Sequence, residues 1–117
     1  MNSNVSVRKS FDFAVRIVRL YQHLTRNKRE YVLSKQLLRS GTSIGANISE
    51  AQRAQSKADF LAKMSIALKE ANETDYWIRL LYQTEYLSKK QYDSISHDIN
   101  ELLCILTAIC KSSTSEK

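Results

Sequence analysis

Apolar residues recur along this chain at alternating spacings of three and four, which is the pattern of a helix that buries one face. The clearest run lies near the carboxyl end and consists of Ile95, Ile99, Leu102, Leu106 and Ile109. Ser88 and Gln91 precede this run at the spacing of a capping box, in which each residue satisfies a backbone amide of the other. The pattern predicts a helix over about 89–111.

Three earlier runs predict three more helices. The run Phe60, Met64, Ala67, Ala71, Thr74, Ile78 and Leu81 follows a cap signal at Ser56 and Asp59, and predicts a helix over about 57–86. The run Leu37, Gly41, Ile44, Ile48 and Ala51 predicts a helix over about 33–54. The run Phe13, Ile17, Leu20 and Leu24 predicts a helix over about 7–25.

Short connections between the predicted helices favour antiparallel neighbours, so we expect one all-α domain over residues 1–117, an up-down-up-down four-helix bundle. Composition agrees, because the chain of 117 residues has no proline and two glycines, whereas hairpin-rich sheets use both residue types heavily. Some apolar residues fall outside these apolar runs, and the core of a single bundle does not require them. These residues, which predict an interface between subunits, are Phe11, Val15, Leu61, Leu68 and Trp77.

The net charge of +6 is concentrated at the amino end, where residues 1–29 hold seven Lys or Arg and one acid. The candidates for nucleic-acid binding, called the basic face below, are Arg8, Lys9, Arg16, Arg19, His23, Arg26, Lys28 and Arg29. Most of them share one side of the first helix. This side offers no aromatic residue for stacking on bases. We expect Arg16 and Arg19 to point away from the bundle and to contact phosphates. The alternative is an ordinary solvated face.

The segment 39–50, RSGTSIGANISE, is unusual for a helix interior because two glycines lower helix propensity by about 2 kcal/mol. Gly41 and Gly45 lie four residues apart, so they clear one side of the helix for the close approach of another. A phosphate-binding loop does not fit, since the Lys-Ser/Thr pair and a preceding strand are missing. A helix-turn-helix fits poorly, because the two positions at which it needs apolar residues are Asn47 and Glu50 when counted from Gly41, or the small Ala51 and Ala54 when counted from Gly45.

The run from Gln36 to Leu81 resembles the core signature of the four-helix bundle family encoded in intervening sequences of bacterial 23S rRNA genes. The matching elements are Arg39, Thr42-Ser43-Ile44, Asn47-Ile48, Glu50-Ala51, Lys69-Glu70-Ala71, Glu73-Thr74 and Tyr76-Trp77. The similarity extends from Phe11 to about Cys110. It implies a left-handed up-down bundle, a homopentameric ring and a basic outer surface that points to nucleic-acid binding. A relative of this family, the accessory variability determinant of diversity-generating retroelements, binds a reverse transcriptase.

A hairpin of the second and third helices, centred near Gln55, explains part of this motif structurally. It places Arg39 opposite Glu70 and Glu73, and we expect a partly buried ion pair that fixes the register of the two helices. It also places Asn47 opposite Lys63. The residues assigned to this structural motif are Arg39, Gly41, Ser43, Gly45, Asn47, Glu50, Glu70 and Glu73.

No residue pattern points to catalysis, a cofactor or a metal. Bundle enzymes with two metals use Glu-x-x-His pairs, which this sequence lacks, and its two histidines, His23 and His97, have no ligand partners at a recognised spacing. Cys104 and Cys110 are six residues apart on one helix and cannot bridge each other. Without a leader or a long apolar run, we expect a cytoplasmic protein that does not enter the membrane.

The sequence therefore predicts a non-enzymatic oligomer that binds nucleic acid through the basic face, with RNA, and ribosomal RNA in particular, as the candidate ligand. The alternative is a scaffold that docks a partner protein without touching nucleic acid. A ligand-binding or catalytic bundle is a third interpretation, which a pocket with convergent polar groups would favour.

Overall fold

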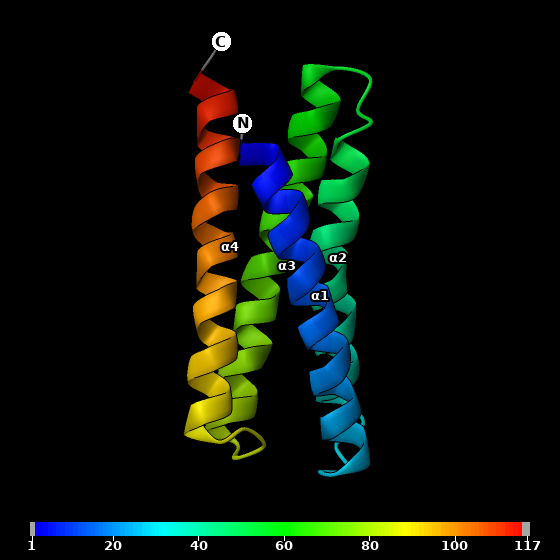
Figure 1. Ribbon diagram of the computed structural model, residues 1–117, viewed down its shortest axis with the longest axis vertical. Helices are drawn as coiled ribbons and strands as arrows, with labels where there is room; N and C mark the ends of the chain where they lie inside the picture. Colours follow the sequence, from blue (N-terminus) through cyan, green and yellow to red (C-terminus); the bar gives the residue numbers. More distant parts are fainter. Residues whose placement is uncertain (1, 116–117) are drawn as a thin grey trace.

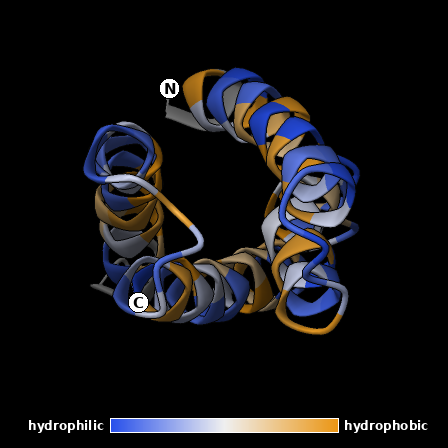
Figure 2. Ribbon diagram, turned by 90° about the horizontal axis from the view of Figure 1, so that it is seen from below, coloured by the Kyte–Doolittle hydropathy of each residue, from blue (hydrophilic) through white to orange (hydrophobic). Residues whose placement is uncertain are grey.

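The structure is a computed structural model that describes residues 2–115, with side chains described for residues 5–112. Four helices, α1 (Asn2–Arg26), α2 (Leu33–Ala51), α3 (Lys57–Gln83) and α4 (Lys89–Ser115), run alternately up and down along a molecule of 47 × 21 × 19 Å (Figure 1). Viewed along the long axis, the helices follow one another around the core in chain order (Figure 2), and contacts between α1 and α4 join the last helix to the first. The predicted all-α, up-down four-helix bundle is confirmed.

The core contains the apolar lines that the spacing predicts. All five predicted residues of α2 are buried, and on α4 only Ile109, the last of the line, is partly exposed. Two apolar residues expected at a subunit interface, Leu68 and Trp77, instead pack against this core. Leu61 is half-buried, while Phe11 and Val15 on α1 are exposed. The core is thus wider than a single line per helix.

The two glycines of α2 allow α1 to approach closely. A Cβ atom on Gly41 would lie 2.8 Å from the Cγ1 atom of Ile17, and a Cβ atom on Gly45 would lie 3.2 Å from the carbonyl oxygen of Ser10. Both distances are shorter than ordinary van der Waals contacts, so a side chain at either position would require Ile17 or the backbone of Ser10 to shift. The predicted close approach is present, and α1 is the helix that makes it.

The predicted caps at the amino ends of α3 and α4 are present. The amide of Asp59 donates to Ser56 Oγ over 3.0 Å, and Ser88 and Gln91 exchange two hydrogen bonds of 2.8 and 3.1 Å. The carboxyl end of α2 differs from the prediction. This helix ends early, at Ala51, because the next three amides donate to carbonyls three residues back, which tightens the chain into a turn.

The turns that follow α1 and α3 each contain a residue in the left-handed conformation, Arg29 (φ 55°) and Glu85 (φ 72°). The amide that follows each of them donates back to the helix, from Glu30 to the carbonyl of Leu24 and from Tyr86 to that of Leu81, both over 2.9 Å. The Tyr86 bond, together with the bond from the Glu85 amide to the carbonyl of Tyr82, forms the Schellman motif, which most often has glycine at the left-handed position. The Glu30 bond spans six residues and closes a wider turn. Helix α3 therefore stops at Gln83, before its predicted end. The outer ends of the two terminal helices extend past the prediction, to Asn2 and Ser115.

Glu30 fixes the start of α2. Its carboxylate accepts hydrogen bonds from the amides of Val32, Leu33 and Ser34 at 3.1, 2.9 and 2.6 Å, and only 7% of the residue is exposed. Burial raises the pKa of Glu30, but the three amide bonds outweigh burial, so the pKa lies below its ordinary value of 4.5. The turn between α1 and α2 is therefore held at both of its ends.

Candidate nucleic-acid interface

The basic face divides into residues that bond to α4 and residues that remain free. Lys9 forms an ion pair with Glu101 of α4 at 3.1 Å. Arg16 forms an ion pair with Asp98 at 2.6 Å, and its guanidinium also donates to the hydroxyl of Ser94 at 2.9 Å. These two cations join α1 to α4, and their charges are balanced within the molecule.

The position of Arg16 corrects the sequence-based prediction that it points away from the bundle. Arg16 follows the apolar line of α1 closely enough for its long side chain to reach across to α4. A helical pattern identifies the side of a helix on which a residue lies, but it does not identify the neighbouring helix that borders that side. For this reason Arg16 is a structural residue in the isolated chain.

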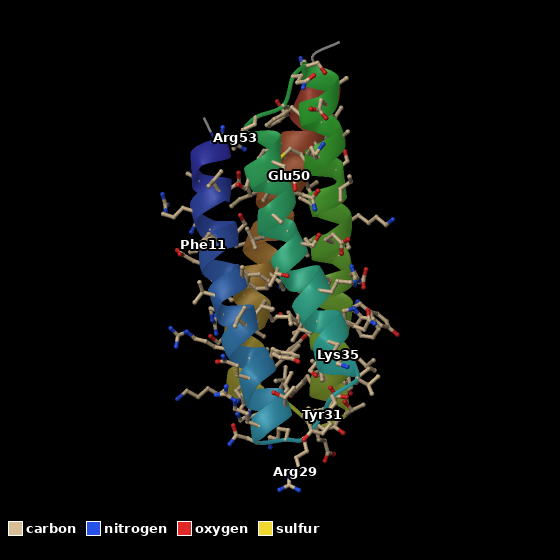
Figure 3. All side chains as sticks on the ribbon, turned by 90° about the vertical axis from the view of Figure 1, so that its right-hand side faces the viewer. Phe11, Arg29, Tyr31, Lys35, Glu50 and Arg53 are labelled. Atoms are coloured by element: carbon tan, nitrogen blue, oxygen red, sulfur yellow. The ribbon has the colours of Figure 1, made fainter. Side chains whose placement is uncertain are left out.

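Five cations of the basic face are exposed, and the described part of the chain offers them no ion-pair partner. They are Arg8, Arg19, Arg26, Lys28 and Arg29. Nitrogen-tipped side chains project from α1 on the side away from the other helices (Figure 3). Four of the five belong to the carboxyl half of α1 and the turn after it, so the free positive charge is concentrated at one end of the bundle.

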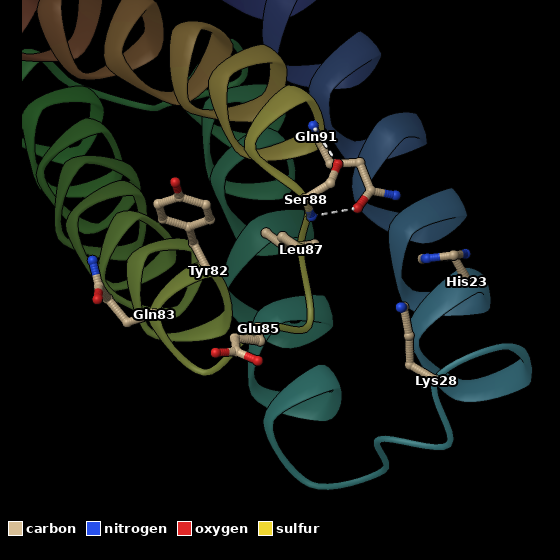
Figure 4. A pocket seen from close by; sticks show the side chains of 8 residues that line it. All are labelled: His23, Lys28, Tyr82, Gln83, Glu85, Leu87, Ser88 and Gln91. Carbon is tan, nitrogen blue, oxygen red and sulfur yellow. Dashed lines mark hydrogen bonds between the residues drawn. The ribbon is translucent and has the colours of Figure 1, made fainter.

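His23 differs from the rest of the basic face because it is half-buried. Its Nδ1 atom lies 3.2 Å from Asn27 Oδ1, and its Nε2 atom is buried without a hydrogen-bond partner among the described residues. His23 and Lys28 border a hollow of about 730 Å³ between the end of α1 and the α3–α4 turn (Figure 4). Across this hollow lie Glu85 and Gln91.

A smaller hollow of about 310 Å³ adjoins the first, since His23 and Gln91 border both. Arg16 and Arg19 form its polar rim, and Leu20 and Ile95 are its apolar residues. The two hollows show that solvent-accessible space separates the carboxyl half of α1 from the start of α4 and the α3–α4 turn. Cations of the basic face border this space from the α1 side.

The ion pair predicted within the structural motif is present. Arg39 Nη1 lies 3.2 Å from Glu70 Oε1, and Arg39 Nη2 contacts Glu73. Hydrogen bonds from Trp77 Nε1, at 3.0 Å, and from Arg39 hold the pKa of Glu73 below its ordinary value. Because the Arg39 side chain is half exposed, this network fixes register more than it adds stability.

The remaining polar residues of the motif bond locally or stay free. Asn47 donates to the carbonyl of Ser43 at 2.9 Å, within α2. Lys63, which the hairpin register places opposite Asn47, pairs with Asp59 of its own helix at 3.3 Å. Glu50 is exposed, and the described residues give it no ion pair. Neither Asn47 nor Glu50 therefore forms a bond between helices.

Among the described residues, no cluster of three or more histidine, cysteine, aspartate or glutamate side chains could hold a metal ion. None of the four helices, over the residues described, is both long enough and apolar enough to cross a membrane. Neither cysteine forms a disulfide among the described residues, and Cys104 is exposed.

The exposure of several residues does not follow from the sequence pattern. Tyr31 and Lys35 lie beside the free cations, at the turn after α1 and the start of α2, and both are exposed. Tyr31 falls between the predicted helices, where an apolar pattern carries no information about exposure. The exposure of Ile66 and Tyr76, two apolar residues on α3, is likewise not predicted.

The arrangement of the helices and the cations on α1 define an up-down four-helix bundle with a basic first helix. The model of the 23S rRNA-intervening sequence protein family matches residues 2–108, and the chain belongs to this family. A crystal structure of a protein of unknown function from Bacteroides thetaiotaomicron, described as a member of the S23 ribosomal protein family, is 58% identical. The match covers 95% of this chain and 99% of that chain, with a TM-score of 0.93. No curated protein matches the sequence.

Proposed function

We propose that this protein is a non-enzymatic oligomer that binds RNA through phosphate contacts along α1. The observation that supports this proposal is the set of five exposed cations without ion-pair partners among the described residues. An exposed cation with no acidic partner remains available to a phosphate, and a row of such cations attracts a polyanion. Ribosomal RNA is one candidate, because the family takes its name from the 23S rRNA gene.

The contacts in this proposal are to the backbone of the RNA. Arginine and lysine bind phosphate oxygens without reading the bases, so we expect unrelated sequences to bind alike. Arg19 and Arg26 are the best candidates for a test, because both are exposed and neither bonds to α4. Arg16, by contrast, is already paired with Asp98 and is unsuitable.

Replacing Arg19 and Arg26 together with glutamine should weaken binding to structured RNA and reduce its salt dependence. For every phosphate that the variant no longer binds, the slope of log K against log salt should fall by about 0.7–0.9, since fewer condensed counterions are released. Filter binding at several salt concentrations measures this slope. The matched control replaces Arg53 and Lys111, two exposed cations outside the basic face, and removes the same charge. Equal losses of affinity in the two double variants, or a wild-type protein that ignores RNA at low salt, would contradict the proposal.

The oligomer in this proposal is a homopentamer, as the family resemblance implies, and an apolar surface supports self-association. Phe11 on α1 is 67% exposed, and Val15 and Val18 lie beside it with exposed fractions of 38% and 39%. Phe11 also borders a mostly apolar hollow of about 350 Å³ between α1 and α2, with Gly45 and Ala46 opposite. A neighbouring subunit would cover this surface.

Phe11→Ser should lower the mass of the particle, because it removes the most exposed aromatic side chain of this surface. Light scattering measures the mass at micromolar concentration. Val32→Ser is the control, since Val32 is still more exposed, at 72%, but lies outside the α1–α2 hollow. A wild-type monomer would remove the oligomer from the proposal.

The alternative function, a scaffold that docks a partner protein without binding nucleic acid, is favoured by the same apolar surface. It requires Phe11 to be free in the oligomer and RNA binding to be absent. The two functions therefore differ in the outcome of the filter-binding experiment.

A further inference from the structure

The turn between α1 and α2 carries an exposed aromatic ring within the concentration of free positive charge. Tyr31 is 54% exposed and Val32, its neighbour, is 72% exposed. Arg29, Tyr31 and Lys35 lie at the same end of the molecule (Figure 3). We call residues 26–35 the α1–α2 corner.

Positive charge dominates the exposed part of this corner. Arg26, Lys28, Arg29 and Lys35 are exposed, and no described residue forms an ion pair with any of them. Between Asp12 and Glu50 the chain contains a single acid, Glu30. That acid is buried and its carboxylate is occupied by three amides of α2, so it is not available to the surface cations. From outside the corner, Glu85 borders the same hollow as Lys28.

The backbone on both sides of Tyr31 is held in place. On one side the amide of Glu30 bonds to the carbonyl of Leu24, and on the other the amide of Val32 bonds to the Glu30 carboxylate. Arg29 completes this arrangement in the left-handed conformation, which is uncommon for a residue other than glycine. A ring carried on a fixed backbone loses little conformational freedom when it binds a ligand.

We propose that Tyr31 stacks on an unpaired base of a bound RNA strand while the cations of the α1–α2 corner hold the phosphates on either side of that base. This inference rests on the proposed function and narrows it to a class of RNA. An exposed ring between cations is the arrangement by which proteins bind single-stranded nucleic acid, because each base offers a flat face and each phosphate a charge. Bases within a duplex are stacked on one another and cannot reach the ring. Single strands, loops and bulges are therefore the RNA that the corner fits.

The charge of the corner argues against a second copy of the chain as its occupant. Contact between the corners of two copies would bring like charges together, which opposes association. An RNA strand supplies the complementary charge. A partner protein, or another surface of a second copy, is distinguished by the experiment below.

The test compares two half-exposed tyrosines. Tyr31→Ala removes the ring from the corner, and Tyr76→Ala removes a ring of nearly equal exposure, 51%, from α3. Binding is measured at low salt with a single-stranded RNA of about 12 nucleotides, within the range of site sizes for such surfaces, and with a duplex of equal length. Tyr31→Phe keeps the ring and serves as the conservative variant. Light scattering and circular dichroism monitor assembly and fold.

We expect Tyr31→Ala to weaken binding of the single strand about tenfold and to leave binding of the duplex unchanged. Tyr31→Phe should bind like the wild type, and Tyr76→Ala should change neither affinity. Unchanged binding of the single strand by Tyr31→Ala, equal losses of affinity for both RNAs, or a smaller particle would overturn the stacking role while phosphate binding stands. A wild-type protein that binds neither RNA would overturn the proposed function together with the inference.

Discussion

Helix α1 contacts its two neighbours in opposite ways. Against α2 it packs closely at the two glycines, where the Ile17 side chain meets Gly41 and the backbone of Ser10 meets Gly45, and a mostly apolar hollow opens beside Gly45. Against α4 it reaches across a wider seam with long polar side chains, Arg16 and Lys9, and hollows remain between the two helices. The same helix therefore has one seam determined by shape and one determined by charge.

The difference shows where each kind of change is tolerated. Close packing gains many small contacts and fails when a single atom is added, because neighbouring backbone cannot move aside cheaply. Exposed ion pairs, such as those between α1 and α4, contribute less to the free energy of unfolding. Such a contact region tolerates both water and substitutions of its side chains. Helix α1 can therefore be strongly fixed in the bundle while one of its sides remains open to solvent and to ligands.

Gly45→Leu tests the close packing of α1 against α2 and should give the largest loss of stability. A leucine side chain would meet the carbonyl oxygen of Ser10 and force α1 away from α2, so we expect a decrease of about 2–3 kcal/mol in the free energy of unfolding. Ala62→Leu, at an exposed position on α3, is the control and should change stability by less than about 0.5 kcal/mol. Urea denaturation measures both. Equal midpoints would show that the contact at Gly45 is loose.

Glu30→Gln tests the turn that joins the closely packed pair, and we expect a decrease of about 1–2 kcal/mol in stability at neutral pH because three amides lose a charged acceptor. The pKa of Glu30 is depressed in the folded state. Its contribution to stability is thus fully present above the ordinary value of 4.5 and disappears as the pH falls through the lower folded value. The gap in melting temperature between variant and wild type should narrow below pH 4.5. Glu50→Gln, at an exposed glutamate, should show no gap at any pH.

Arg16→Gln probes the polar seam and should have the smallest effect. Its ion pair with Asp98 is more than one-third exposed, so screening by solvent limits the decrease in stability to about 0.5–1 kcal/mol. The decrease should shrink in high salt. Arg19→Gln, with no partner on α4, should leave stability unchanged. An effect of Arg16→Gln as large as that of Gly45→Leu would show that the two seams do not differ as described.

The sequence predicts most of the fold, because the fold depends on local periodicity. Apolar spacing located the core residues, and polar side chains marked the starts of α3 and α4. The paired glycines predict a close approach but do not identify the helix that makes it. Hairpin register also predicts the pairing of Arg39 with Glu70 and Glu73, since a short turn fixes which residues of two antiparallel helices lie at the same height.

The features that the sequence did not predict depend on contacts between distant segments or on backbone conformation. The partner of Arg16 lies more than eighty residues away on α4, and helical spacing does not identify it. The turns that follow α1 and α3 adopt left-handed conformations at Arg29 and Glu85, where no glycine signals the stop. The exposure of Tyr31 follows from the path of the turn and not from any periodicity.

The chain order of the helices around the core has a consequence for the speed of folding. Three of the four contacting helix pairs, α1–α2, α2–α3 and α3–α4, are neighbours in sequence. Among the described residues, α1 and α4 are the only contacting helices that lie far apart in the chain. Contacts that are close in sequence require little loop closure, so such topologies fold quickly. We expect the transition state to contain α2 and α3, whose packing is the most extensive, and the seam between α1 and α4 to close late. Changes in that seam should then accelerate unfolding and leave the folding rate nearly unaltered.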